Sequence, residues 1–117
     1  MSYMLLIHEP LGQRAERTLD EGKAAYARML AFGQELREQG LLVASESLKS
    51  HEDAVRVQVR EGRQRLVDGP FAEVKEMVGG FFLLSCRTRE EALAIATRCP
   101  AAEWATVEVR ALAPCYE

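Results

Sequence analysis

Two short segments of the chain are apolar at almost every position, and they constrain the fold more than any other feature. Residues 3–8 read YMLLIH, and residues 79–86 read GGFFLLSC. A short uninterrupted apolar run is typical of a β-strand that is buried on both faces. The chain must therefore build a sheet and provide cover for both of its faces.

Two segments have the pattern of a capped amphipathic helix. Thr18 stands three residues before Glu21, as in a capping box, where each side chain satisfies a free backbone N–H of the first helical turn. Apolar residues then recur at helical spacing, which predicts a helix over 19–39. The same Thr-x-x-Glu pattern recurs at 88–91, before a second helix that Pro100 terminates.

Further strands are predicted over 41–48, 55–60, 63–67 and 106–112. The segment VRVQVR at 55–60 alternates strictly, which is typical of a half-buried strand, and Glu61-Gly62 turns it back into the next strand. The order is β-α-β, a hairpin insert, then β-α-β. This order predicts an α+β fold of the ferredoxin-like arrangement, in which both helices pack on one face of an antiparallel sheet.

The predicted arrangement leaves the second face of the sheet without helices. The two apolar runs would then expose on the order of several hundred Å² of apolar surface. A second copy of the same sheet, related by a two-fold axis, is the simplest cover. We therefore predict a homodimer packed sheet to sheet.

Composition and motifs narrow the class of protein further. The 117 residues are predicted to form one domain, 1–117, and a net charge of −3 with scattered Lys and Arg predicts no nucleic-acid partner. The N-terminal apolar run is too short for a signal peptide or a membrane span.

Three cysteines without CxxC spacing predict reduced thiols of a cytoplasmic protein and no metal site. Dinucleotide and Walker motifs are absent, so no cofactor is expected.

The segment VDGPFAEVKEMVGGFFLL at 67–84 resembles the YCII-related family, in its DGPF branch. The resemblance extends to YMLLI at 3–7, EEALAIATRCPA at 90–101 and VEVRAL at 107–112. It implies a ferredoxin-like domain that pairs into a dimeric α/β barrel. Another branch of the family carries a proposed His–Asp catalytic pair, whose positions are occupied here by Met29 and Cys99. The resemblance therefore does not extend to that pair.

Asp68 opens the DGPF segment and has two interpretations. Its carboxylate is placed to accept the N–H of Phe71 and to cap a helical turn over 70–77, with Gly69 and Pro70 shaping the turn. Phe71 would then be a hydrophobic anchor. Alternatively, Asp68 faces a pocket and orients a substrate or acts as a base. The sequence leaves both interpretations open.

Other ionisable residues are candidates for a site near this segment. His8 ends an apolar strand, and histidine is the side chain that titrates nearest to neutral pH, so His8 is a candidate for proton transfer. The alternative is a strand-end histidine bonded to Glu9 or to a backbone carbonyl. Glu73 and Lys75 either form a solvated face or meet a ligand, whose carboxylate Lys75 would hold. His51 lies in a polar loop and is expected to be exposed.

The leading hypothesis is a homodimer with a small-molecule cleft beside the 68–76 loop. As an enzyme it would carry out a cofactor-free acid–base step, of lyase or isomerase type, on a small polar or aromatic molecule. The predicted catalytic residues are Asp68 and His8, and the predicted ligand-binding residues are Gly69, Pro70, Phe71, Glu73 and Lys75. The alternative is a non-catalytic module that binds a metabolite or another protein. The sequence does not decide between an enzyme and a binding module.

Overall fold

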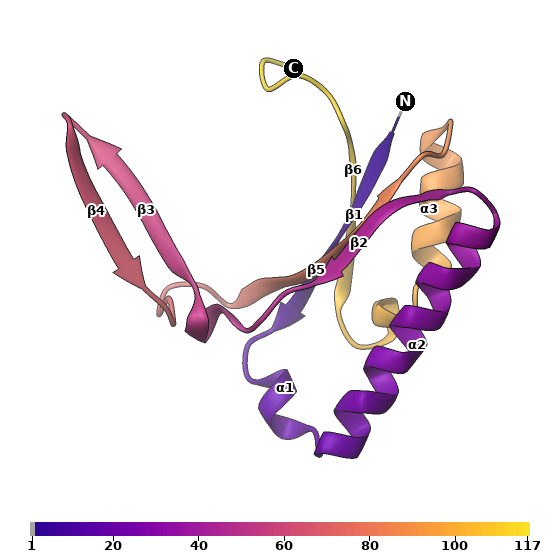
Figure 1. The fold of residues 1–117 in the computed structure, drawn as a ribbon, viewed down its shortest axis with the longest axis horizontal. Coiled ribbons are helices and arrows are strands. Elements are labelled where there is room, and N and C mark those ends of the chain that lie inside the picture. Colours follow the sequence, from indigo (N-terminus) through magenta and orange to yellow (C-terminus); the bar gives the residue numbers. More distant parts are fainter. Residues whose placement is uncertain (1) are drawn as a thin grey trace.

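The computed structural model describes residues 2–117 and contains a four-stranded antiparallel sheet (Figure 1). The strands are β1 (Tyr3–Pro10), β2 (Leu42–Ser47), β5 (Glu76–Leu84) and β6 (Thr106–Ala111), in the order β2-β5-β1-β6. The two predicted apolar strands, β1 and β5, are neighbours at the centre of the sheet. Their apolar composition follows from this central position, because a central strand is covered along both edges and packs on at least one face.

Both long helices, α2 (Leu19–Glu38) and α3 (Arg89–Arg98), lie on the same side of the sheet (Figure 1). The capping box at Thr18 is complete. The second box is only half formed: the Thr88 hydroxyl accepts the Glu91 N–H, but the Glu91 carboxylate accepts the N–H of Arg87. A short helix, α1 (Gln13–Glu16), was not predicted, and two 3-10 helices occupy His51–Asp53 (η1) and Pro100–Glu103 (η2).

The hydrophobic core lies between the sheet and the two helices. Its largest fully buried side chains are Leu5, Leu36, Leu84, Ile95, Cys86 and Cys99. Alternate residues of β1 are buried under the helices, whereas Met4, Leu6 and His8 lie on the opposite face and are only partly buried. We call this opposite surface the free face of the sheet. Phe81 and Leu83 of β5 pair with Leu6 and Met4 and extend the apolar part of the free face.

The predicted hairpin is confirmed and forms a separate two-stranded sheet of β3 (Val55–Arg60) and β4 (Arg63–Asp68). Glu61 and Gly62 both have positive φ, of 53° and 74°, as a two-residue turn of type I′ requires. The hairpin stands clear of the sheet, on the side away from the helices (Figure 1). The expectation that β3 is half-buried is wrong, because every residue of both strands is exposed.

The double glycine in β5 forms a β-bulge against β1. Ile7 pairs with Gly80 and His8 pairs with Val78, so Gly79 is the extra residue. A bulge re-aims the strand at the point where α1 and the hairpin join the sheet. Within residues 2–117, no helix is long and apolar enough to span a membrane.

Candidate functional site

A cavity of about 760 Å³ lies between α2, α1 and the sheet, and we call it the α2 cleft. Its apolar lining includes Ile7, Met29, Phe82 and Trp104. Its polar lining includes Glu9, Arg14, Arg17, Arg37, Ser45 and Ser47. A largely apolar cavity with a few polar groups is the usual form of a small-molecule site.

The α2 cleft exists because only one half of α2 packs on the sheet. The buried residues of α2, Phe32, Gly33 and Leu36, all belong to its C-terminal half. The N-terminal half, which carries Gly22 and Tyr26, diverges from the sheet, and α1 bridges the gap at the far end (Figure 1). The small residue at Gly33 brings the helix close to Phe82, where an added Cβ would already be in van der Waals contact at 3.4 Å.

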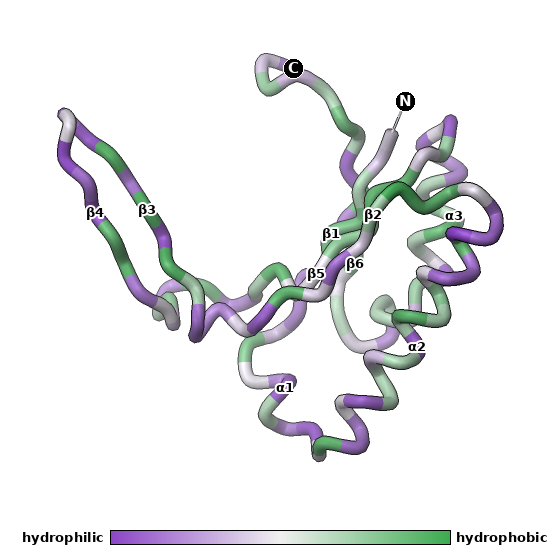
Figure 2. The backbone as a smooth tube through the Cα atoms, viewed as in Figure 1, coloured by the Kyte–Doolittle hydropathy of each residue, from purple (hydrophilic) through white to green (hydrophobic). Residues whose placement is uncertain are grey.

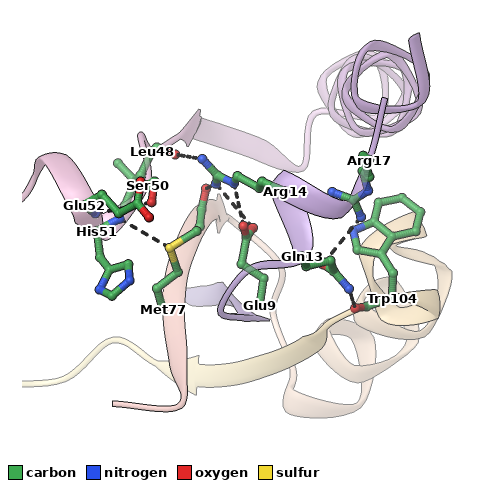
Figure 3. Close-up of polar contacts among 11 residues, drawn as sticks. Glu9, Gln13, Arg14, Arg17, Leu48, Ser50, His51, Glu52, Met77 and Trp104 are labelled. Atoms are coloured by element: carbon green, nitrogen blue, oxygen red, sulfur yellow. Dashed lines mark hydrogen bonds and ion pairs between the residues drawn. The ribbon is translucent and has the colours of Figure 1, made fainter. Parts of the chain in front are cut away.

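An ion pair between Glu9 and Arg14 fixes α1 to the sheet (Figure 3). Arg14 Nε lies 2.5 Å from Glu9 Oε1, and the same guanidinium donates to the carbonyl oxygens of Leu48 at 2.8 Å and Gly79 at 3.3 Å. Glu9 is only 8% exposed although it carries a charge. Buried charges are tolerated where they are paired and fully hydrogen-bonded, and here one arginine joins β1, β5 and the end of β2.

Glycine at position 79 leaves the space that this ion pair occupies. A Cβ at position 79 would lie 2.0 Å from Glu9 Oε2 and 3.0 Å from an Arg14 nitrogen. Any other residue would therefore displace the carboxylate or push the strands apart.

The other end of the α2 cleft is formed by Trp104. Gln13 Nε2 donates to the Trp104 carbonyl at 2.7 Å, and the guanidinium groups of Arg17 and Arg28 lie 5.5 and 5.3 Å from the indole centroid. Arg28 also pairs with Glu103 at 2.6 Å, and this hydrogen bond lowers the pKa of Glu103 from its ordinary value. Arg17 and Arg37 both line the cleft and make no ion pair with any residue in the described part of the chain, and Arg17 is the one that lies beside Trp104.

A second cavity, of about 580 Å³, lies where the hairpin joins the sheet, and we call it the hairpin-base cavity. Its lining includes His8, His51, Arg56, Phe71 and Met77. It thus brings together the predicted residues His8 and Phe71, which are far apart in the sequence.

His8 is held by a carboxylate that the sequence did not reveal. His8 Nε2 and Glu108 Oε1 are 2.6 Å apart, on the free face of the sheet, and both side chains are partly exposed. In the tautomer that donates Nε2–H to Glu108, Nδ1 is an acceptor. No sequence spacing connects His8 with Glu108, because the contact depends on the pairing of β1 with β6.

The structure corrects the predicted role of Asp68 as a helix cap. No helix forms over 70–77, and the N–H of Phe71 donates to His51 Nδ1 at 3.4 Å. Asp68 lies exposed at the end of β4, opposite Val55, and lines neither cavity described above. His51 is partly buried instead of exposed, because its ring packs against Phe71 at a centroid distance of 5.9 Å.

The DGPF loop is anchored mainly by Phe71 and Gly69. Phe71 is 6% exposed and has the Arg56 guanidinium 3.8 Å above its ring, which confirms it as a hydrophobic anchor. The Gly69 N–H donates to the Ala54 carbonyl at 2.8 Å, and a Cβ at Gly69 would lie 1.9 Å from the His51 carbonyl oxygen. The Gly69-Pro70 peptide bond is cis.

The remaining predicted ligand-binding residues lie outside the two cavities. Glu73 is exposed and pairs with Arg56 at 3.2 Å, so it holds the loop to the hairpin. Lys75 is exposed, and its carbonyl accepts the N–H of Leu11. Gly69 and Pro70 shape the loop but do not line the hairpin-base cavity. In the described residues, no group of three His, Cys, Asp or Glu side chains is placed to hold a metal ion.

A model of the YCII-related domain matches residues 1–115. The chain belongs to the YCII-related family. Among solved structures, it is similar to 5-chloro-2-hydroxyhydroquinone dehydrochlorinase (TftG) from Burkholderia phenoliruptrix AC1100 in complex with 2,5-dihydroxybenzoquinone. The identity is 14%, the match covers 97% of this chain and 94% of that chain, and the TM-score is 0.58, so the similarity is one of fold. No curated protein matches the chain.

Within this YCII-related chain, the two positions assigned to the His–Asp pair of the other branch differ in their surroundings. Met29 packs against the core and lines the α2 cleft, whereas Cys99 is buried in the core and does not line the cleft. Burial raises the pKa of the Cys99 thiol, which keeps it protonated and unreactive at neutral pH.

Sequence reasoning missed the polar groups that build the α2 cleft. In the sequence, Glu9 follows an apolar run, and no motif connects it with Arg14 or Arg17. A sequence signal was present in the bulge at Gly79-Gly80, since a glycine in a strand often marks a close approach of another group. It did not identify Glu9 as the group that approaches.

Proposed function

We propose that this YCII-related domain binds a small aromatic molecule with an acidic group in the α2 cleft. The observation that carries the proposal is the combination of an apolar wall with a cation, Arg17, that forms no ion pair in the described chain. A cavity of about 760 Å³ falls within the range of roughly 300–1,000 Å³ that is usual for small-molecule sites.

The chemistry of the cleft defines the class of ligand. Met29, Phe82 and Trp104 offer apolar surface to a planar ring. Arg17, a planar fork of N–H donors, would hold a carboxylate or an acidic hydroxyl of that ring. The one carboxylate deep in the cleft, Glu9, is already paired with Arg14, so the cleft favours binding over proton transfer. TftG was solved with 2,5-dihydroxybenzoquinone, a planar ring with acidic hydroxyls, which makes this compound a suitable probe.

Titration of the purified protein with 2,5-dihydroxybenzoquinone, followed by calorimetry, is expected to show binding that depends on Arg17. Arg17→Gln removes the cation beside Trp104 and should weaken binding about tenfold, as loss of a charge-assisted hydrogen bond would. Arg98→Gln removes an exposed arginine that does not line the cleft and is the matched control. Equal affinities for the two variants would contradict the role of Arg17.

A second candidate function, acid–base catalysis, is supported by the His8–Glu108 pair at the hairpin-base cavity. Glu108 holds the His8 ring at a hydrogen-bond distance of 2.6 Å, and in the tautomer that donates Nε2–H to this carboxylate Nδ1 is the acceptor. An imidazole oriented by a carboxylate is the usual arrangement of a general base. Asp68, the other predicted catalytic residue, would then contribute by supporting the loop that carries Phe71. No cofactor enters this proposal.

The catalytic candidate predicts that His8→Gln lowers turnover by about 100-fold. Elimination of chloride from 5-chloro-2-hydroxyhydroquinone is the assay, chosen because TftG is a dehydrochlorinase of this compound. Asp68→Asn is the control, and its activity should stay within about threefold of the unmodified protein. Unchanged turnover in His8→Gln would remove His8 from the mechanism, and the chain would then act as a binding module.

The proposal includes a homodimer packed sheet to sheet, which would give the α/β barrel. Met4, Leu6, Phe81 and Leu83 are partly exposed on the free face, and α2 and α3 lie on the opposite side of the sheet. A second copy on this face would bury these side chains and exclude water from His8.

A further inference from the structure

The single chain has more surface than a compact monomer of its size. Its accessible area is 8274 Å², against roughly 6,400 Å² expected for 13.1 kDa. Its radius of gyration is 16.0 Å, against about 13 Å expected. The excess area, 8274 Å² less roughly 6,400 Å², is about 1,900 Å², which exceeds the roughly 800 Å² that each partner buries in an interface of standard size.

The hairpin contributes to this excess of accessible surface, because every residue of β3 and β4 is exposed. One side of the hairpin is mainly apolar. Val55, Val57 and Val59 are 52%, 58% and 58% exposed, and Leu66, which pairs with Val57, is 59% exposed. These four residues share one side of the two-stranded sheet, because cross-strand partners point the same way. Figure 2 shows the alternation of apolar and polar residues along β3. A two-stranded hairpin alone in water is marginally stable, so this side needs a partner surface.

The other side of the hairpin is basic. Arg56, Arg60, Arg63 and Arg65 lie there, whereas the acidic residues of the segment lie elsewhere: Glu61 in the turn, and Asp68 at the base of the apolar side, opposite Val55. Residues 55–68 therefore carry a net charge of +2, which leaves −5 for the rest of a chain whose total is −3. The hairpin of one copy is thus attracted to the body of another, and this charge difference favours a second copy of the chain as the partner.

We propose that the hairpin is an exchange arm: the apolar side of each hairpin, formed by Val55, Val57, Val59 and Leu66, packs on the second copy of the chain. The inference rests on the sheet-to-sheet dimer proposed above. The hairpin projects on the side of the sheet away from α2 and α3, which is the side that the second copy would occupy (Figure 1). In a two-fold dimer this contact occurs twice, because the hairpin of each copy packs on the other copy.

The exchange arm makes the hairpin-base cavity dependent on the dimer. Ala54 and Arg56, at the start of β3, line this cavity together with His8 and Phe71. In the single chain this wall is held only at the base of the hairpin, by the Arg56–Glu73 ion pair and the hydrogen bond from Gly69 to Ala54. Contact of the arm with the second copy fixes the wall, so the cavity is complete only in the dimer.

The test is the dimer dissociation constant, measured by analytical ultracentrifugation. Val57→Lys with Leu66→Lys places two charges on the apolar side and is expected to raise the dissociation constant by about 100-fold. Gln58→Lys with Val67→Lys adds the same charge on the opposite side and is expected to change it by no more than about threefold. A dimer that persists in the first variant overturns the exchange arm and leaves the sheet-to-sheet dimer intact.

A second measurement on the unmodified protein covers the case in which a variant does not fold. Amide hydrogen exchange of residues 55–68 is expected to slow as protein concentration is raised through the dimer dissociation constant. Hairpin amides that exchange freely in the assembled dimer would overturn the exchange arm. An unmodified protein that stays a particle of 13.1 kDa at all concentrations would overturn both the arm and the dimer.

Discussion

Gly79→Ala is expected to lower the free energy of unfolding by about 3 kcal/mol, the size of effect seen when a buried ion pair is broken. The new methyl carbon would lie 2.0 Å from Glu9 Oε2, so the carboxylate must leave its position. Arg14 would then keep its charge without its partner, and α1 would lose its connection to β1 and β5. Urea denaturation followed by circular dichroism measures the change.

Gly22→Ala is the matched control for this substitution. A Cβ at Gly22 meets no atom within 4 Å, and the residue lies inside α2. The control is therefore expected to raise stability by up to about 1 kcal/mol, the difference in helix propensity between the two residues. A Gly79→Ala protein as stable as the unmodified chain would show that the Glu9–Arg14 pair does not organise the α2 cleft.

Gly69→Ala is expected to lower the free energy of unfolding by about 2 kcal/mol and to loosen the base of the hairpin. A Cβ at Gly69 would lie 1.9 Å from the His51 carbonyl oxygen, which belongs to the backbone and cannot rotate away. The loop must separate from η1, and the hydrogen bonds from Gly69 to Ala54 and from Phe71 to His51 would be lost.

Hydrogen exchange separates this local effect from a general loss of stability. Amides near the hairpin base, at residues 51–55 and 68–71, are expected to lose protection first in Gly69→Ala, while the centre of β1 keeps it. Ala72→Ser, at an exposed position of the same loop, is the control. A uniform loss of protection over the whole sheet would contradict a local role for the DGPF loop.

The helices and strands could be predicted from the sequence because their signals are local. The capping pattern at Thr18 sets the start of α2, and the Glu61-Gly62 turn sets the register of the hairpin. The order β2-β5-β1-β6 followed from the ferredoxin-like arrangement. The exposure of the hairpin could not be predicted, because alternation along VRVQVR shows only that one side is apolar and not which surface covers it.

The candidate site could be predicted only in part, since its contacts join distant segments. His8 and Phe71 were expected near one cleft, and both line the hairpin-base cavity. Asp68 was expected to bond Phe71, but His51 accepts that N–H, from a loop whose position depends on the whole hairpin. The Arg14 bond to Gly79 spans 65 residues, and no spacing rule connects two such positions.

The central claim, that the α2 cleft is a small-molecule site organised by Glu9, Arg14 and Arg17, is tested most directly by a crystal structure with 2,5-dihydroxybenzoquinone. The account predicts the ring between Met29 and Trp104, with an acidic oxygen within hydrogen-bond distance of the Arg17 guanidinium. A compound that binds in solution but lies outside the α2 cleft in the crystal would contradict the claim.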